Sequence, residues 1–391
     1  YTGYEDEIIQ SVEAGNVSLS TPASFVGSSQ ALFGIKAQFQ LGPLTLQTVM
    51  SQKKGQTKEL TAAGGAQEKP FEIRAFNYST NHYFLDTLYR TIFETYNASI
   101  VGQLSDPTML YYQVNEIEVW KTKVGYIPQP GETAMDGVAF IDLNPTTPSI
   151  QYPDSLRNES SVSGRIERAK WVKLQPNEFK INKYTGYVSI NTNISDDQAL
   201  AVAFRTTGPT GSPDDDFMYG DFAGADTTNR LVLKLIRPKN LVPSYKPAWD
   251  LMLKNIYSLG GSNLKKEGFD LKIYREAGGV SDQDGLEGTS LLKILNADKY
   301  GSDNSPTPDG FFDYIPGYTV DEARAEIIFP DLEPFRKPIR DFLLSKYLAE
   351  SVIDSLTFPE VYDTLRFAAQ QSIRSKYIIR GKSSTERQSK Y

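Results

Sequence analysis

A turn-rich segment near residue 310 carries the residues best suited to hold a metal ion. Asp303, Asn304, Asp309 and Asp313 fall within a short stretch in which Gly310 permits a sharp bend. Carboxylate and amide oxygens on such a loop are ligands that Ca²⁺ prefers. The spacing lacks the final glutamate of an EF-hand loop. A structural calcium ion is the one cofactor that the sequence suggests, and the alternative is that these side chains form turns with their own backbone.

Other metal and nucleophile chemistries are excluded by two residue counts. The chain has no cysteine and a single histidine, His82. Thiolate metal sites, disulfide frameworks and cysteine nucleophiles are therefore absent, and very few Ser–His–acid arrangements remain. His82 lies among aromatic residues, where we expect a packing or capping role. An enzyme with this composition would have to use carboxylates, lysine, tyrosine or an oxygen-ligated metal.

Pairs of acidic residues occur along the chain, such as Asp282 with Asp284 and Glu116 with Glu118. A glycosidase needs two carboxylates at a fixed separation around the sugar. A chain with 48 acidic residues contains many such pairs by composition alone, and no recognisable motif surrounds these. We therefore predict no catalytic residue. A carboxylate-based hydrolase is the remaining catalytic hypothesis.

The overall charge and length narrow the choice of partners and domains. The 391 residues carry 41 Lys and Arg against 48 Asp and Glu, a net charge of −7. This length favours two or three domains, and the acidic balance argues against nucleic acid as a partner. The sequence has no run of 18 apolar residues that would predict a transmembrane helix. Because the chain opens on Tyr1 rather than a signal peptide, we expect a processed or excised piece.

The clearest local pattern is an alternation that begins at Phe33. Apolar residues alternate with Gly34, Lys36, Gln38 and Gln40, and a second run follows the Gly42-Pro43 turn and includes Gln47. Period two over this length predicts a β-hairpin with one apolar and one polar face. The same pattern is found in soluble sandwiches and in the walls of membrane barrels. The residues alone favour the soluble interpretation, because a closed membrane barrel needs about eight or more such strands and only this hairpin shows the full pattern.

Further elements are predicted along the rest of the chain. Helical spacing from about Ser79 or Thr80 to Asn97 predicts a helix, and a second helix is predicted over residues 247–260. Strands are predicted at residues 117–120, 138–141, 179–190, 199–205, 231–236 and 269–273, and two helical stretches at 342–356 and 359–375. The fold class is therefore strand-rich α+β, with antiparallel β-sandwich-like modules and several helices.

Eight segments, read in order, resemble one family, the SprA/Sov proteins. They are EAGNVSL at 13–19, GSSQALFGIK at 27–36, FEIR at 71–74, IEVW at 117–120, TGYVSI at 185–190, WDLMLKNIYSLG at 249–260, PDGFFD at 308–313 and IIFPDLEPF at 327–335. Their order and their spread over nearly the whole chain carry the resemblance. Members of this family are giant outer-membrane translocons of the type IX secretion system and of gliding motility in Bacteroidetes. Because they are several times longer, the resemblance implies an N-terminal fragment.

The resemblance implies a domain division and a function. Residues 1–70 are expected to form a hairpin of outer-membrane-barrel type with its connection, 71–240 a strand-rich module with one helix, and 241–391 a mixed α+β module. The chain is then a non-catalytic element of the wall or cap of a protein-conducting pore in the bacterial outer membrane, with extracytoplasmic soluble portions. Expected partners are secreted cargo proteins, a shuttle barrel, a periplasmic plug protein and outer-membrane lipid. Lys36, Gln38, Gln40 and Gln47 would face the pore.

A second hypothesis belongs to another class of protein. Aromatic residues make up 12% of the chain, and the segment from Asp303 to Asp313 is a calcium candidate. Both features are typical of surface glycan-binding or adhesion modules built on β-sandwiches. This alternative predicts saturable binding to a polysaccharide through exposed aromatic side chains.

Overall fold

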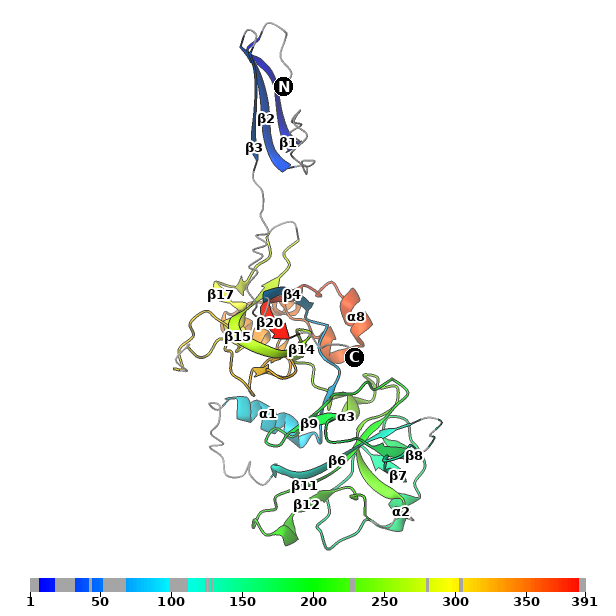
Figure 1. Cartoon of the computed structure of the whole chain (residues 1–391). Coiled ribbons are helices and arrows are strands. Elements are labelled where there is room, and N and C mark those ends of the chain that lie inside the picture. Colours follow the sequence, from blue (N-terminus) through cyan, green and yellow to red (C-terminus); the bar gives the residue numbers. More distant parts are fainter. Residues whose placement is uncertain are drawn as a thin grey trace. The chain divides into compact units, whose positions relative to one another are not determined.

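The computed structural model describes most of the chain and divides it into two compact units. The described residues are 7–17, 32–41, 44–51, 68–98, 112–123, 125, 127, 129–224, 229–278, 281–301 and 305–386. One unit is Tyr1–Gly65 and the other Ala66–Tyr391. Both are built mainly from antiparallel strands, and the helices are few and short (Figure 1). The fold is therefore a strand-rich α+β fold. The predicted division near residue 240 stays a prediction.

The described residues of the first unit form an antiparallel sheet of three strands. The strands are β1 (Ile9–Val17), β2 (Leu32–Leu41) and β3 (Leu44–Ser51), in the order β1-β2-β3. The hairpin of β2 and β3 pairs Leu41 with Leu44 next to its turn and Gly34 with Ser51 at its far end. β1 was not predicted from the sequence. It pairs with the other edge of β2, with an irregularity between Ile9 and Ser11.

The second unit contains a closed barrel rather than the predicted sandwich. Its strands are β6 (Val114–Thr122), β7 (Ala134–Phe140), β8 (Ile166–Lys173), β11 (Leu200–Thr206) and β13 (Leu231–Arg237). They follow the order β11-β13-β7-β8-β6, and β11 also pairs with β6, which closes the sheet on itself. β7 and β13 run parallel. The prediction of a sandwich was wrong because alternation alone does not show whether a sheet ends or closes.

Smaller antiparallel sheets complete this unit. One has the order β5-β10-β9 and one β14-β19-β18, while β15-β20-β4 forms a third and β16 with β17 a short ribbon. The bounds of these strands and of β12 are β4 Glu68–Arg74, β5 His82–Phe84, β9 Phe179–Asn182, β10 Tyr187–Ile190, β12 Phe217–Tyr219, β14 Ile256–Ser258, β15 Ser262–Arg275, β16 Gly285–Leu286, β17 Thr289–Ser290, β18 Val320–Asp321, β19 Glu326–Ile328 and β20 Tyr377–Glu386. Strand β12 extends the barrel sheet at β11.

The helices are α1 (Leu88–Ala98), α2 (Asp154–Arg157), α3 (Lys246–Trp249), α4 (Leu291–Ile294), α5 (Lys337–Ser345), α6 (Glu350–Leu356), α7 (Glu360–Asp363) and α8 (Arg366–Gln371). Over the described ranges, no helix is long and apolar enough to cross a membrane.

Two of the helices predicted from the sequence need correction. The helix expected from residue 80 begins only at Leu88, where the Asp86 carboxylate accepts the Leu88 N–H at 3.0 Å, because residues 82–84 pair with β10 instead. The helix expected over 247–260 ends at Trp249, because residues 256–258 pair with β19.

One hydrophobic core runs through the second unit from Ala75 to Ile379. Trp120, Trp171 and Phe204 are fully buried in it. The two ends of this unit lie side by side in one sheet, because β20 pairs antiparallel with β4 and places Glu68 opposite Ser384. Adjacent ends are typical of a module that can be inserted into a loop of another structure.

Candidate functional site

The sheet of the first unit has one polar face. Lys36, Gln38 and Gln40 alternate along β2 and are half-buried. These are three of the four residues predicted to face a pore, and the fourth, Gln47, pairs with Gln38 in the register of β2 and β3. The Thr45 hydroxyl donates a hydrogen bond to the Gln40 amide oxygen at 2.8 Å. Uncharged amides and hydroxyls therefore follow one another along this face, beside Lys36 and Glu13, which lie opposite each other on β2 and β1.

The opposite face of the same sheet is apolar. It carries Phe39 and Leu41 from β2, Leu46 opposite Phe39 on β3, and Ile9 opposite Phe39 on β1. Ile9, Leu41 and Leu46 remain 42%, 48% and 47% exposed. An apolar sheet face in water needs a cover, either from another layer of protein or from lipid. Over the described residues, this face has no covering layer within its own unit.

The predicted calcium loop is only partly described, because Asp303 and Asn304 lie outside the described residues. The Asp313 carboxylate accepts the backbone N–H of Lys299 at 2.7 Å and of Tyr300 at 3.2 Å. The Asp309 carboxylate accepts the N–H of Phe311 at 3.0 Å. These carboxylates therefore serve backbone donors, as in the alternative interpretation. Within the described ranges, no group of three or more His, Cys, Asp and Glu is arranged to hold a metal ion. The calcium site stays a prediction.

Asp298 is a further acidic residue of this region that the sequence analysis missed. It is buried, and its two carboxylate oxygens accept the N–H groups of Asp309 at 3.0 Å and of Gly310 at 3.2 Å. Burial raises the pKa of Asp313, and the nearby charges of Asp298 and Asp309 add to this effect, while the two backbone N–H groups oppose it. Buried carboxylates that satisfy backbone donors in this way fix the shape of a loop.

A cavity lined by aromatic side chains lies beside this loop. Its volume is about 270 Å³, and Phe269, Phe311, Phe312 and Tyr314 line it. The Phe269 ring packs edge-on against Tyr314, with the ring centres 5.1 Å apart, while Phe311 is 67% exposed. The carboxylates of Asp270 and Asp309 also line the cavity. Aromatic faces with carboxylate acceptors beside them suit a ligand that combines apolar C–H groups with hydroxyl donors.

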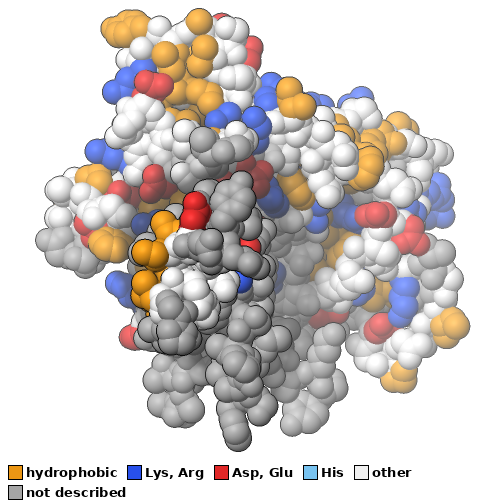
Figure 2. Space-filling view, turned by 90° about the horizontal axis from the view of Figure 1, so that it is seen from above, with side chains coloured by type: hydrophobic (Ala, Val, Ile, Leu, Met, Phe, Trp, Pro, Cys, Tyr) orange, Lys and Arg blue, Asp and Glu red, His pale blue; other side chains and the backbone are white. Residues whose placement is uncertain are grey.

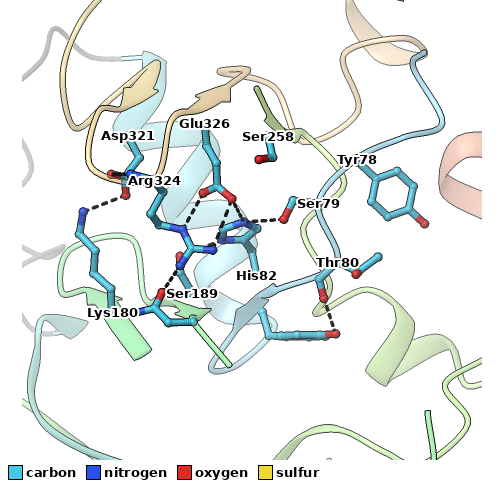
Figure 3. A network of polar contacts seen from close by, with 12 residues as sticks. Tyr78, Ser79, Thr80, His82, Lys180, Ser189, Ser258, Asp321, Arg324 and Glu326 are labelled. Atoms are coloured by element: carbon cyan, nitrogen blue, oxygen red, sulfur yellow. Dashed lines mark hydrogen bonds and ion pairs between the residues drawn. The ribbon is translucent and has the colours of Figure 1, made fainter. Parts of the chain in front are cut away.

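The single histidine lies at the centre of a buried polar network (Figure 3). One ring nitrogen of His82, Nδ1, lies 2.8 Å from the Ser189 hydroxyl, and Nε2 lies 3.0 Å from the Ser79 hydroxyl and 3.3 Å from a Glu326 oxygen. Arg324 donates to the Glu326 carboxylate at 2.8 Å. Burial alone would raise the pKa of Glu326, but the hydrogen bonds and charges of His82 and Arg324 lower it to about 2.

The network contains a serine, a histidine and an acid, the residue types of a serine hydrolase triad, but all three side chains are buried. His82, Ser189 and Glu326 are 1%, 4% and 4% exposed, so a substrate does not reach the Ser189 hydroxyl in this conformation. His82 and Ser189 come from paired strands, and Glu326 comes from β19. The network therefore joins two sheets of the core. The expected packing role of His82 agrees with this geometry, but sequence gave no sign of its partners.

Three of the four acidic residues noted in the sequence, Asp282, Glu116 and Glu118, are engaged in ion pairs. Asp282 pairs with Arg380, and Glu116 lies 3.5 Å from Arg205. Glu118 is buried and accepts hydrogen bonds from Lys173 at 2.5 Å and from the Ala223 N–H at 2.9 Å. These contacts assign the carboxylates to the stability of the unit rather than to a pair facing a substrate.

Hydrophobic side chains are spread over the surface in several places. On the face shown in Figure 2 they form small separate groups among charged and polar side chains.

Searches of protein-family models and of curated proteins found no match for this chain. The functional interpretation therefore depends on the residues and the geometry described above.

Proposed function

We propose that this chain is part of an outer-membrane protein-conducting translocon of the type IX secretion system, similar to the SprA/Sov proteins, and that its role is non-catalytic. In this proposal the strands of the first unit belong to the pore wall. The unit Ala66–Tyr391 is then a folded insertion that lines or caps the pore. The observation that carries the proposal is the two-faced sheet of β1, β2 and β3.

The dimensions and chemistry of this sheet suit a membrane wall. The three strands have 9, 10 and 8 residues, close to the roughly 9–11 residues of a transmembrane strand. In such a wall, apolar side chains meet lipid and polar side chains meet a wet lumen. Phe39, Leu41 and Leu46 would contact lipid, and Lys36, Gln38 and Gln40 would face the lumen.

The second unit supports the same proposal through the position of its ends. Residue 68 lies opposite residue 384 on paired antiparallel strands, so the polypeptide enters and leaves the unit at one place. An insertion with adjacent ends leaves the pairing of the surrounding strands undisturbed. In this proposal secreted cargo proteins, a shuttle barrel and a periplasmic plug protein contact the wall and the insertion, and the protein serves secretion and gliding motility at the cell envelope.

A cysteine scan tests the wall directly, because the chain has no cysteine of its own. Single substitutions Gln38→Cys, Gln40→Cys, Ala37→Cys and Phe39→Cys would be placed in the full-length parent in a type IX-secreting bacterium. A water-soluble maleimide should label positions 38 and 40 in the intact membrane and leave positions 37 and 39 unlabelled until the protein is denatured. Equal labelling of all four positions in the intact membrane would contradict the membrane wall.

Recovery of partners tests the secretion role separately. The tagged parent should be isolated from the outer membrane together with secreted cargo and barrel partners. Recovery of polysaccharide alone, from a parent that is only attached to the surface, would overturn the translocon proposal.

The alternative function, a surface glycan-binding module, is favoured by one specific observation. The aromatic cavity near Phe311 presents ring faces and carboxylates together. This function predicts that Phe311→Ala abolishes saturable binding of a polysaccharide. Phe367→Ala is the matched control, because Phe367 is 74% exposed and does not line that cavity. Equal loss in both variants, or no binding to begin with, would contradict the alternative.

A further inference from the structure

A second cavity of the unit Ala66–Tyr391 has a different character from the aromatic cavity near Phe311. Its volume is about 270 Å³, close to the lower end of the roughly 300–1,000 Å³ that small-molecule sites occupy. Tyr78, Tyr83 and Trp249 contribute aromatic rings, and Arg237 and Arg366 contribute guanidinium groups. The lining comes from the segment before β5, the end of β13, helix α3 and the start of α8.

Arg237 is a buried cation at the wall of this cavity. It is 6% exposed and donates hydrogen bonds to the carbonyl oxygens of Ser195, at 3.0 Å, and of Gln198. It also donates to the Asp196 carboxylate at 3.2 Å, although the Asp196 side chain is 93% exposed. These contacts hold the guanidinium in place before any ligand arrives. A fixed charge of this kind binds an anion at little cost in side-chain entropy.

Arg366 is an exposed cation at the rim of the same cavity. Its guanidinium carbon lies 5.0 Å from the centre of the Tyr78 ring, and one of its N–H groups donates to the Tyr78 carbonyl oxygen. Burial raises the pKa of Tyr78 to about 12, although the charge of Arg366 opposes this, so the phenol stays neutral at physiological pH. The rim therefore presents a positive charge above an aromatic side chain.

The residues that line this cavity differ in charge from the chain as a whole and from the residues that line two other cavities. Two arginines and one aspartate line it, in a chain whose net charge is −7. The aromatic cavity near Phe311 is lined by three aspartates and one lysine. A third cavity, of about 260 Å³, is lined by Asp86, Asp142 and Lys234, and its lysine is paired with Asp86 as Arg237 is with Asp196. The cavity at Arg237 is the positive one of these three.

We propose that the cavity at Arg237 and Arg366 binds the carboxylate of an acidic monosaccharide, a uronic acid. Guanidinium groups recognise planar carboxylates through paired N–H donors. Arg366 at the rim is placed to offer such donors, while Arg237, whose two terminal nitrogens already donate to Ser195, Gln198 and Asp196, adds its charge. The exposed side chains of Thr80 and Asn81 at the rim supply partners for the ring hydroxyls. The aromatic walls suit the apolar face of a sugar ring. The cavity volume admits one such residue, either free or at the end of an acidic polysaccharide. This binding site does not depend on the role of the N-terminal sheet.

Calorimetric titration of the full 391-residue chain with D-glucuronate and with D-glucose tests the ligand class. The two sugars share their ring and differ at C6, where glucuronate has the carboxylate. We expect saturable binding of glucuronate and at least tenfold weaker binding of glucose, because only glucuronate can form a hydrogen-bonded ion pair with a guanidinium group. Equal affinities, or no saturation with glucuronate at about 20 mM, would overturn the proposal. A uronate oligosaccharide then separates the two sources, because tighter binding than the monomer identifies a chain end.

Two substitutions test the residues of the site. Arg366→Gln should raise the Kd for glucuronate at least tenfold and leave the weak binding of glucose unchanged. Asn81→Asp keeps the size of an exposed side chain and adds a negative charge, so it should weaken glucuronate binding selectively. Arg340→Gln is the matched control, because Arg340 pairs with Glu350 on another part of the unit. If Arg366→Gln unfolds the chain, Asn81→Asp decides, and wild-type affinity in that variant contradicts the assignment.

Discussion

The two units of this protein place similar side chains in opposite environments. In Tyr1–Gly65, apolar residues such as Phe39 and Leu46 lie on one face of a three-stranded sheet, and Leu46 is 47% exposed. In Ala66–Tyr391, apolar residues of equal size are enclosed by a closed barrel and the sheets around it. The second unit therefore carries its own core, whereas the described residues of the first unit form no layer over the apolar face of its sheet. The difference supports the proposal that the sheet belongs to a wall and the second unit is an insertion.

The largest expected effect comes from a matched pair of phenylalanines. Phe204 is fully buried on β11, and its ring stacks on Tyr219 with the ring centres 4.4 Å apart. Phe204→Ala should lower the free energy of unfolding of the second unit by about 3–5 kcal/mol, because it leaves a cavity. Phe39→Ala should leave that transition unchanged. Urea titration of both variants measures the comparison, and equal losses would show that the two units unfold together.

A pair of acidic residues should show a smaller effect. Asp313 is 6% exposed and accepts two backbone N–H groups, whereas Glu13 on β1 is exposed. Asp313→Ala leaves these donors without an acceptor and should lower stability by about 1–3 kcal/mol. Glu13→Ala should change it by less than about 0.5 kcal/mol. Thermal unfolding of both variants with added calcium and with a chelator is the measurement. A shift with calcium in the wild type that Asp313→Ala removes would favour the predicted calcium site over the turn interpretation.

A buried lysine of the second unit should make its stability depend on pH, whereas a half-buried lysine of the first unit serves as the control. Lys254 is 5% exposed, and its ammonium group donates to the carbonyl oxygens of Trp249 at 2.9 Å and of Met252 at 3.3 Å. Burial, with a further contribution from the charge of Arg90, lowers the pKa of Lys254 from 10.5 to about 7. Between these two values the unfolded chain binds one more proton than the folded chain. Stability should therefore rise with pH across this window by up to about 1.4 kcal/mol per unit.

The variant Lys254→Met should remove this slope, whatever it does to stability at a single pH. Lys36→Met is the control, because Lys36 lies half-buried on the polar face of β2, and the slope should remain in that variant. Urea titrations at pH 7, 8 and 9 measure the slope. If the wild type shows no rise between pH 7 and 9, Lys254 is not held in the folded state as a destabilised cation.

Local patterns in the sequence predicted single elements well and their assembly poorly. The hairpin of β2 and β3 follows from alternation, because period two reports directly on the two faces of a strand. β1 was missed because Gly15 and Ala14 interrupt its pattern with small residues. The closed barrel was not predicted, because closure depends on β11 pairing with two strands at once, one of them more than 70 residues earlier.

The candidate sites show the same limit. His82 was predicted to pack, but its partners Ser189 and Glu326 lie 107 and 244 residues away along the chain. The cavity at Arg237 likewise joins side chains from the segment before β5 and from α8, and no short motif marks them. The predicted helix over 247–260 had correct apolar spacing, but pairing of β14 with β19 determined the structure instead. Contacts distant in sequence therefore decided what local propensity left open.

The smallest expected effect tests the sheet of the first unit on its own. The hydroxyl of Thr45 donates to Gln40 across the hairpin, on the polar face, and a cross-strand pair of this kind contributes about 0.2–1 kcal/mol. Thr45→Val removes the donor and keeps the shape of the side chain. In detergent, where the micelle covers the apolar face and holds the hairpin together, hydrogen exchange of the β2 and β3 amides should be slow. Thr45→Val should accelerate it by at most about fivefold, because the lost cross-strand pair contributes no more than about 1 kcal/mol. In water without detergent the same amides should exchange much faster, with or without the substitution. Equal protection in water and in detergent would show that the sheet is stable by itself, and the contrast between the two units would then no longer support a membrane wall.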